Sequence, residues 1–403
     1  MGRAGRLSRR QLVKSMTYDY DFDEIIDRRR TDSNKWRKYP ADVLPLWVAD
    51  MDFRSPESVI RALHERVEHG VFGYGVEQPE FCEVFLDRLQ TRYGWRVSPE
   101  AILVIPGVIP GFNLAGRALT VTGDGLLLQT PVYPPILRVP GNVGLTSDEM
   151  ELTRQADGRY TIDFDRFETT IRERTRVFLL CNPHNPVGRV FRTDELLRMA
   201  EICLGRGLLI CADEIHCDLV FSGQRHVPIA SLDPEVAART ITLMAPSKTF
   251  NLPGLKCSVA IIPNAPLREK FGAARVDLVK AVNVLGYAAA LAAYRDGQPW
   301  LDELLRYLEA NRDFLVEYVR SKLPGVSMAP PEATYLAWLD CREGDLPRND
   351  PYTFFLDEAR VALNDGKAFG CGGAGFVRLN FACPRAILAE ALDRMRQALE
   401  RRA

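Results

Sequence analysis

Three short apolar runs, each with a polar residue just past its C-terminal end, constrain the fold of this chain most strongly. The runs and the polar residues after them are Val177–Cys181 with Asn185, Gly207–Ala212 with Asp213, and Ile241–Met244 with Lys248. Such runs are typical of strands that are buried on both faces of a parallel sheet. Ligands of open parallel sheets bind outside the carboxyl ends of the strands. We therefore expect the three polar side chains to converge on one site.

Lys248 is the reactive residue of this set. It follows Ala-Pro-Ser247 and precedes an aromatic residue and a Leu-Pro-Gly turn. In an apolar cleft the ammonium form is disfavoured, so the pKa falls and the free amine becomes a nucleophile towards aldehydes, as a Schiff-base lysine requires. The alternative is a surface lysine on a loop after a strand. This stretch alone does not decide between the two interpretations. The presence of Asn185 and Asp213 at the other strand ends favours the Schiff-base lysine.

Length, charge and cysteine content narrow the class of protein. At 403 residues the chain exceeds a typical single core, which predicts two domains. The formal net charge of -1 provides no field to hold nucleic acid or an anionic membrane, and no apolar run approaches the length of a membrane span. Nine cysteines without a Cys-x-x-Cys motif favour a reducing cytoplasm, and the five histidines show no metal-ligand spacing. We expect no metal site and no nucleic-acid partner.

A second ligand-binding feature precedes the three runs. Ala101–Gly107 is typical of a strand, a glycine-proline turn follows it, and Phe112–Leu119 is typical of a helix. Orphan backbone N–H groups and the positive end of a helix dipole make such a junction a candidate anion site. Most glycine turns bind nothing, but beside a candidate Schiff-base lysine this one predicts an anion cradle, with N–H groups from Val108 and Ile109.

The alternation of strands and helices predicts an α/β fold in which a mostly parallel sheet lies between helices. After Asn283 the pattern changes to a long helix over Leu301–Leu323, two alternating strands and a final helix. We interpret residues 55–283 as a large cofactor-binding domain. Residues 16–54 together with 284–403 are predicted to form a smaller α+β domain, and residues 1–15 a disordered basic extension.

Six ordered motifs resemble those of the pyridoxal-phosphate enzymes of the aspartate-aminotransferase fold (fold type I). More narrowly, they resemble the cystathionine β-lyase subgroup of MalY/PatB type. The motifs are Leu44–Phe53, Phe72–Gly75, Cys181–Gly188, Ala212–His216, Ala245–Asn251 and Phe376–Arg385. The resemblance covers nearly the whole chain and implies pyridoxal 5'-phosphate as the cofactor. Within the first motif, Asp50 and Asp52 fit a paired-carboxylate or metal site, but we prefer turn and cap carboxylates on a loop.

The resemblance implies roles for residues around the cofactor ring. Asp213 would keep the pyridine nitrogen protonated, Asn185 would donate to the ring's 3-oxygen, and Tyr133 would stack on the ring. His216 stands where many aminotransferases have a tyrosine, and this difference points to the lyase subgroup. The residues alone also allow purely structural interpretations. Asp213 fits a strand-end cap, Tyr133 a packed loop aromatic, and His216 a core histidine satisfied by a backbone carbonyl.

The remaining implied roles concern proton transfer, the substrate and the phosphate. Lys248 would act as general base on the Cα proton. Arg378 would clamp the substrate carboxylate, since a planar guanidinium suits a carboxylate; the alternative is a structural arginine. Lys256 replaces the phosphate-binding arginine of many relatives and would serve as a point charge, or else the phosphate relies on backbone N–H groups and Ser247. Tyr74 would reach the phosphate from a partner chain, so the site is expected to need a homodimer, although Tyr74 also fits an ordinary loop tyrosine.

Three functions remain open on the sequence. The preferred one is a carbon–sulfur β-lyase that cleaves cystathionine or a related cysteine S-conjugate to a thiol, pyruvate and ammonia. The second is a class I/II aminotransferase on the same scaffold. The third is a regulator that keeps the fold for ligand binding, but only about 50 residues precede the fold motifs, which is too few for an added DNA-binding domain. The preferred sulfur amino acid is not readable from the sequence.

Overall fold

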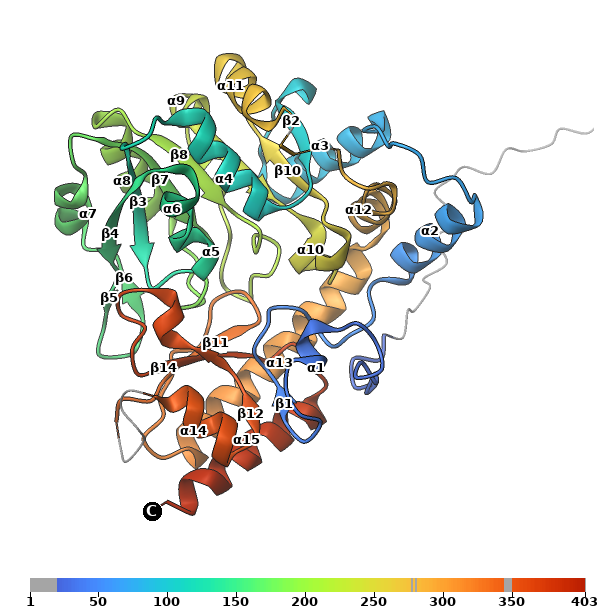
Figure 1. The fold of residues 1–403 in the computed structure, drawn as a ribbon, viewed down its shortest axis with the longest axis vertical. Helices are drawn as coiled ribbons and strands as arrows, with labels where there is room; N and C mark the ends of the chain where they lie inside the picture. Colours follow the sequence, from blue (N-terminus) through green and yellow to red (C-terminus); the bar gives the residue numbers. More distant parts are fainter. Residues whose placement is uncertain (1–19, 277, 280, 344–349, 403) are drawn as a thin grey trace, which may run out of the picture.

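A seven-stranded sheet forms the centre of the larger part of the molecule (Figure 1). The computed structural model describes residues 20–276, 278–279, 281–343 and 350–402, so the basic extension predicted at residues 1–15 lies outside the described residues. The strand order is β2 (Ile102–Ile105), β10 (Ser258–Ile261), β9 (Thr240–Met244), β8 (Leu209–Asp213), β7 (Thr175–Cys181), β3 (Gly125–Thr130) and β4 (Thr146–Glu151). Only β10 runs antiparallel to its neighbours, which confirms the predicted mostly parallel sheet.

Helices cover both faces of this sheet, and the strands alternate between them. In β7, Leu179 packs into the core shared with α4 (Val108–Leu119) and α11 (Ala265–Arg275). The next residue along the chain, Leu180, packs on the opposite face with α8 (Thr193–Gly205). Burying one such leucine contributes about 1.5–3 kcal/mol relative to leaving it in water. Because helices cover both faces of the sheet, successive apolar side chains of these strands are covered on either face. The strands therefore appear in the sequence as continuous apolar runs.

The three central strands end at the same level. In the parallel pairing of β7 with β8, Cys181 lies beside Asp213, and in the pairing of β8 with β9, Asp213 lies beside Leu243. The segments that follow the three strands therefore leave the sheet side by side. The convergence expected from the sequence is confirmed at the level of the backbone.

The C-terminal part contains a smaller sheet and long helices. α13 (Gln298–Lys322) confirms the helix predicted over Leu301–Leu323. The smaller sheet has the antiparallel order β11 (Leu336–Asp340), β14 (Phe376–Asn380) and β13 (Asn364–Asp365). α14 (Pro351–Glu358) and α15 (Arg385–Glu400) pack against each other and close this part. α12 (Val284–Asp296) packs on the N-terminal helices α2 (Glu57–Glu68) and α3 (Pro79–Tyr93), and the domain boundary at residue 283 stays a prediction.

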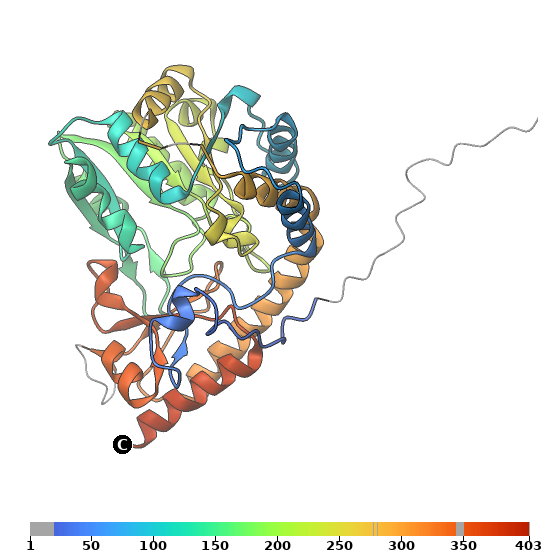
Figure 2. The ribbon, with the colours of Figure 1, turned by 45° about the vertical axis from the view of Figure 1, so that its right-hand side comes forward.

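The N-terminal segment joins the C-terminal part. β1 (Leu44–Pro45) pairs in parallel with β12 (Val361–Ala362), and both views place α1 (Asn34–Arg37) beside it (Figures 1 and 2). The remaining elements are α2 (Glu57–Glu68), α3 (Pro79–Tyr93), α5 (Pro134–Leu137), α6 (Val139–Val143), α7 (Phe164–Thr170), α9 (Pro234–Ala238), α10 (Pro246–Thr249), β5 (Thr153–Arg154), β6 (Tyr160–Thr161), and 3-10 turns at Pro99–Ala101, Ile229–Ser231, Pro253–Leu255 and Gly366–Phe369. None of the helices in these described ranges has the length and apolar character needed to span a bilayer.

Candidate active site

A cavity of about 420 Å³ lies beyond the carboxyl ends of β7, β8 and β9. It brings together most of the side chains singled out in the sequence. The predicted residues that line it are Val108, Ile109, Tyr133, Asn185, Asp213, His216, Ser247, Lys248 and Lys256. Two predicted residues lie elsewhere, since Arg378 sits behind Asn185 and Tyr74 is on a distant loop.

Lys248 lies in the four-residue helix α10, directly after β9. Its Nζ donates a hydrogen bond of 2.6 Å to the backbone carbonyl of Ala49. Burial lowers the pKa of Lys248 to about 8, and the positive charge of Arg378 adds to this effect, against the opposing charges of Asp50 and Asp213. A lysine with this pKa is partly neutral near pH 8, so its amine can act as a nucleophile or a base.

Asp213 ends β8 and faces the same cavity. Its Oδ1 accepts the backbone N–H of Ile215 at 3.2 Å. Burial raises the pKa of Asp213 to about 7, because that hydrogen bond and the charge of Lys248 only partly offset the loss of solvent. Asp213 forms no ion pair within the part of the chain that the structure describes, so this buried carboxyl is suited to a cationic group of a ligand.

Arg378 lies behind Asn185, which itself lines the cavity. Arg378, on β14, donates from Nη1 to Oδ1 of Asn185 at 2.9 Å and from Nη2 to the carbonyl of Trp47 and to Asn364. With its Oδ1 engaged, Asn185 presents its Nδ2 as a donor. Burial lowers the pKa of Arg378 to about 10, its Nε has no hydrogen-bond partner, and no carboxylate of the described residues pairs with it. A buried guanidinium without a counter-charge favours an anionic ligand.

His216 is buried one turn after Asp213. Burial lowers its pKa to about 3, and the nearby charges of Lys248 and Arg378 lower it further, so the imidazole is neutral at physiological pH. Its Nδ1 has no hydrogen-bond partner among the residues that the structure describes, and its ring lies edge-on to Tyr335 at 6.0 Å. The structure gives no backbone carbonyl to satisfy that nitrogen, so the plain core-histidine interpretation does not describe this side chain.

The opposite end of the cavity is suited to an anion. α4 begins at Val108, four residues earlier than predicted, so its first turn, with Val108 and Ile109, lines the cavity. Gly107 precedes the helix at φ 131°, a conformation that favours glycine. Ser247 and the exposed Lys256 line this cavity as well. The helix N-terminus, a hydroxyl and an ammonium together suit a phosphate.

Tyr74 lies outside the cavity. Its side chain is fully exposed on the loop between α2 and α3. Apolar neighbours on the same loop are exposed too, including Val71, Phe72 and Val76. The loop borders a hollow of about 380 Å³ formed with α12. Within a single chain, Tyr74 therefore does not contribute to the candidate site.

The two aspartates of the first motif, Asp50 and Asp52, form neither a metal site nor turn caps. Asp52 is buried and accepts from Arg28, Lys35 and Trp36. No group of His, Cys, Asp or Glu side chains in the described residues is arranged to hold a metal ion. The preference for cap carboxylates is corrected here, because buried cations from the preceding segment neutralise the two aspartates.

Three groups in or beside the site were not singled out from the sequence. The carbonyl of Ala49 accepts from Lys248, and it also accepts from the hydroxyl of Tyr335 at 3.0 Å. Ser258 lines the cavity close to Lys256 in sequence. A backbone carbonyl gives no signal in a sequence. Tyr335 follows Thr334 at the start of a predicted strand, so only the pairing of the small sheet could have pointed to it.

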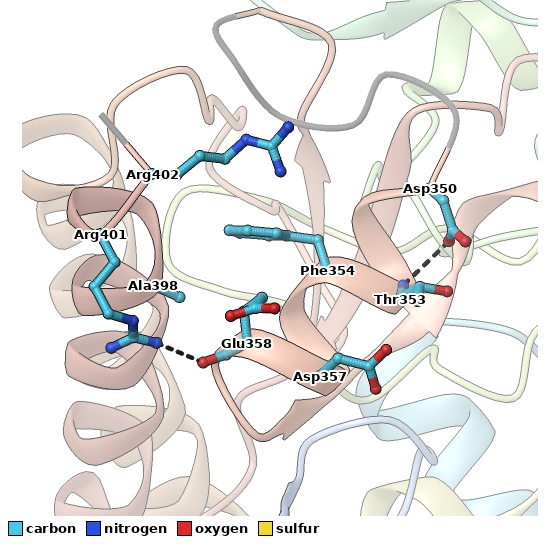
Figure 3. Close-up of a pocket in the computed structure, with 8 residues that line it drawn as sticks. All are labelled: Asp350, Thr353, Phe354, Asp357, Glu358, Ala398, Arg401 and Arg402. Atoms are coloured by element: carbon cyan, nitrogen blue, oxygen red, sulfur yellow. Dashed lines mark hydrogen bonds between the residues drawn. The ribbon is translucent and has the colours of Figure 1, made fainter.

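A second hollow lies far from this chemistry. It has a volume of about 520 Å³ and lies between α14 and α15 (Figure 3). In the figure, Arg401 donates to the backbone of Glu358, and Asp350 accepts from the backbone of Thr353. These bonds cap or join helices. None of the residues singled out in the sequence lines this hollow.

The candidate site fits pyridoxal 5'-phosphate on three observations. Among the described residues, the buried carboxyl of Asp213 has no cation as an ion-pair partner, and the buried guanidinium of Arg378 has no carboxylate. Lys248 between them has a lowered pKa. These groups match a ring nitrogen that carries a proton, a substrate carboxylate and an aldehyde.

Comparisons with known proteins agree with this geometry. A family model described as aminotransferase class I and II matches residues 41–395. Cystathionine beta-lyase PatB of Bacillus subtilis is 40% identical and aligns over 94% of this chain and 100% of its own length. The crystal structure of OvoB has a TM-score of 0.90 at 46% identity, over 94% of this chain and 99% of that one. Cystalysin from Treponema denticola, whose crystal structure contains a pyridoxal 5'-phosphate cofactor, has a TM-score of 0.92 at 33% identity, over 95% and 100% of the two chains.

Proposed function

Since the chain belongs to the class I and II aminotransferase family, in its MalY/PatB-type subgroup, we propose that it is a pyridoxal 5'-phosphate-dependent carbon–sulfur β-lyase. The reaction converts a cysteine S-conjugate and water into a thiol, pyruvate and ammonia. The meeting of Lys248, Asp213 and Asn185 in one cavity carries the cofactor assignment. The relatives named cystathionine beta-lyase and C-S lyase support the choice of reaction.

The cofactor, when bound, supplies an electron sink that stabilises negative charge at the substrate Cα, so that a thiolate can leave from Cβ. The chain's own residues set its orientation. Asp213 holds a proton on the ring nitrogen, Asn185 donates to the ring oxygen from Nδ2, and Tyr133 covers the ring. The residues assigned to the phosphate are Val108, Ile109, Ser247 and Lys256.

Lys248 is the proposed base. Burial lowers the pKa of its amine to about 8, and the backbone carbonyl of Ala49 in the N-terminal segment accepts a hydrogen bond from it. A neutral amine takes the Cα proton of the substrate and can later return a proton. His216 stays neutral beside it and serves as a hydrogen-bonding group rather than a proton carrier.

Arg378 is the proposed substrate clamp. Its guanidinium is already oriented by Asn185, Asn364 and the carbonyl of Trp47. A substrate carboxylate supplies the negative charge that the described surroundings of Arg378 lack, and a preoriented fork loses little freedom on binding. The substrate class supported by this arrangement is an α-amino acid with a sulfur substituent at Cβ.

The proposed assembly is a homodimer with shared sites. The exposed apolar loop that carries Tyr74 supports this, because large apolar side chains exposed together mark protein interfaces. In the dimer, Tyr74 of one chain reaches the phosphate end of the other chain's cavity. We also propose a cytoplasmic location, which is supported by nine cysteines that are all free thiols.

The test compares the wild type with Lys248→Ala after both have been incubated with the cofactor. The wild type should become yellow and release thiol from cystathionine, and the variant should do neither. Arg320→Ala, which replaces an exposed surface arginine on α13, is a control that should match the wild type. Thiol release by Lys248→Ala at the wild-type rate would refute the proposed function.

A further inference from the structure

Residues 47–53, called the strap below, lie across the candidate site without belonging to a sheet. Each backbone carbonyl from residue 47 to residue 51 accepts a hydrogen bond from a side chain. The pairs are Trp47 with Arg378 (3.0 Å), Val48 with Asn380 (2.7 Å), Ala49 with Lys248 (2.6 Å) and Tyr335 (3.0 Å), Asp50 with Asn380 (2.7 Å) and Lys35 (3.1 Å), and Met51 with Asn251 (3.0 Å) and Arg28 (3.1 Å). Two of these donors, Lys248 and Arg378, are the proposed base and substrate clamp.

The strap is fixed from its other side by Asp52. The Asp52 carboxylate is 3% exposed and accepts three hydrogen bonds. They come from Arg28 at 2.6 Å, from Lys35 at 2.7 Å and from the indole of Trp36 at 2.7 Å. Lys35 is fully buried and also bonds the carbonyl of Asp50. Breaking a buried pair of this kind leaves a charge uncompensated, so the cluster holds the strap firmly.

Asp52 does not line the cavity and bonds none of its residues. Its influence on the site passes through the strap backbone, since Asp52 is three residues from Ala49. The Ala49 carbonyl accepts a hydrogen bond from the Lys248 amine, and Ala49 lines the cavity beside it. An anchored strap therefore determines both the direction of the amine and its access to water.

We propose that Asp52 is a positioning residue, which acts through the strap to hold Lys248 and Arg378 in working geometry. This inference rests on the proposed function for the roles of those two residues. It assigns a function to a buried ion cluster that lies outside the reacting groups.

Loosening the strap changes the pKa of Lys248 in a defined direction. The charged and titratable groups that face it are Arg378, Asp50, Asp213 and His216. Burial is the largest cause of its lowered pKa. A loosened strap admits water to the amine, and the pKa of Lys248 then rises towards its ordinary value.

The experiment measures the rate at which the apoprotein binds pyridoxal 5'-phosphate as a function of pH, followed by absorbance. The neutral amine of Lys248 is the reacting form, so the midpoint of the rate profile reports its pKa. In Asp52→Asn this midpoint should move upward by about one pH unit, because hydration removes part of the burial effect. A steady-state assay of the loaded protein should show a higher KM together with a lower kcat.

Asp148→Asn is the matched control. Asp148 is an equally buried carboxylate on the edge strand β4, paired with Arg174 at 2.8 Å and with Thr175 at 2.7 Å. Its loss should destabilise the fold while leaving the midpoint unchanged. If Asp52→Asn does not fold, Trp36→Phe removes one donor to Asp52 and leaves the charges paired, and it should shift the midpoint upward by a smaller amount.

Two results would overturn the inference. One is a midpoint equal to the wild type in every folded strap variant. The other is an equal shift in Asp148→Asn, which would mean that general destabilisation moves the midpoint. A wild type that binds no cofactor would instead reject the proposed function, and the inference with it.

Discussion

Replacing Asp213 by asparagine should make the cofactor-free protein more stable and the enzyme inactive. The pKa of this carboxyl is raised by burial from 3.8 to about 7. The difference is about 3 units, and at about 1.4 kcal/mol per unit it corresponds to about 4 kcal/mol. Asparagine keeps a carbonyl oxygen for the N–H of Ile215 and carries no charge into the site.

The direction in which the free energy of unfolding changes with pH follows from proton linkage. Between pH 4 and pH 7 the folded carboxyl still holds its proton while the unfolded chain has lost it. The free energy of unfolding therefore falls as pH rises through this window, and the full cost of about 4 kcal/mol is present at pH 8. For a chain of 403 residues this amounts to about 5 °C in the melting temperature.

The assay is thermal unfolding of cofactor-free wild type and Asp213→Asn at pH 8 and pH 5. We expect the variant to melt several degrees higher at pH 8, with a smaller gain at pH 5. Adding pyridoxal 5'-phosphate should remove or reverse this difference in melting temperature, because the carboxylate of the wild type then gains a cationic partner.

Asp218→Asn is the control of opposite sign. Burial would raise the pKa of Asp218, but the charges of Arg88 and Arg92 outweigh it and lower the pKa to about 2. This carboxylate stabilises the fold by about 2 kcal/mol above pH 4, a contribution that is lost as pH falls towards 2. Asp218→Asn should therefore melt lower at pH 8. If Asp213→Asn also melts lower than wild type at pH 8 without cofactor, the account of the site as an uncompensated buried charge is wrong.

Three further predictions concern substrate, assembly and pH. Arg378→Lys should lower kcat/KM by about 100-fold to 1000-fold, mainly through KM, because a point charge cannot replace a bidentate clamp worth about 3–4 kcal/mol; an unchanged KM would remove Arg378 from the substrate site. Mixing inactive Lys248→Ala with weakened Tyr74→Ala should restore activity through hybrid dimers that contain one intact site, and no recovery after confirmed subunit exchange would contradict the shared site. His216→Gln should reduce the rate without moving the pH profile between pH 6 and 9, because the pKa of His216 is about 3; a displaced profile would show that His216 titrates during turnover.

Much of the site could be predicted from the strand ends. The apolar runs before Asn185, Asp213 and Lys248 occur in order, and parallel strands bring their carboxyl ends to one edge. Pairing of Cys181 with Asp213 and of Asp213 with Leu243 places those ends level. Local pattern and topology were sufficient here because the sheet is buried on both faces.

The strap could not be predicted in the same way. Asp50 and Asp52 looked like loop carboxylates, since nothing in a sequence shows that Lys35 becomes fully buried. Only the first two residues of the extended segment pair as β1. The strap that follows bonds to side chains of β14, α10, α1 and several loops, and such long-range contacts leave no periodic pattern.

The first residue of α4 could not be predicted from the sequence, although the helix could. The helix predicted from Phe112 begins at Val108, because Gly107 can adopt a positive φ and Pro110 fits the first turn of a helix. The sequence pattern identified the helix but not the turn that faces the cavity. That difference matters for the phosphate site, where the first two N–H groups of the helix are the proposed donors.

The central claim is that the enzyme eliminates a thiol rather than transferring an amino group. The most direct measurement incubates the cofactor-loaded protein with cystathionine, without any 2-oxo acid, and follows pyruvate and free thiol over time. The account predicts that both appear in equal amounts over many turnovers per subunit. If no thiol is released and the cofactor absorbance is lost once, to be restored only by adding a 2-oxo acid, the β-lyase assignment is contradicted and the protein is an aminotransferase.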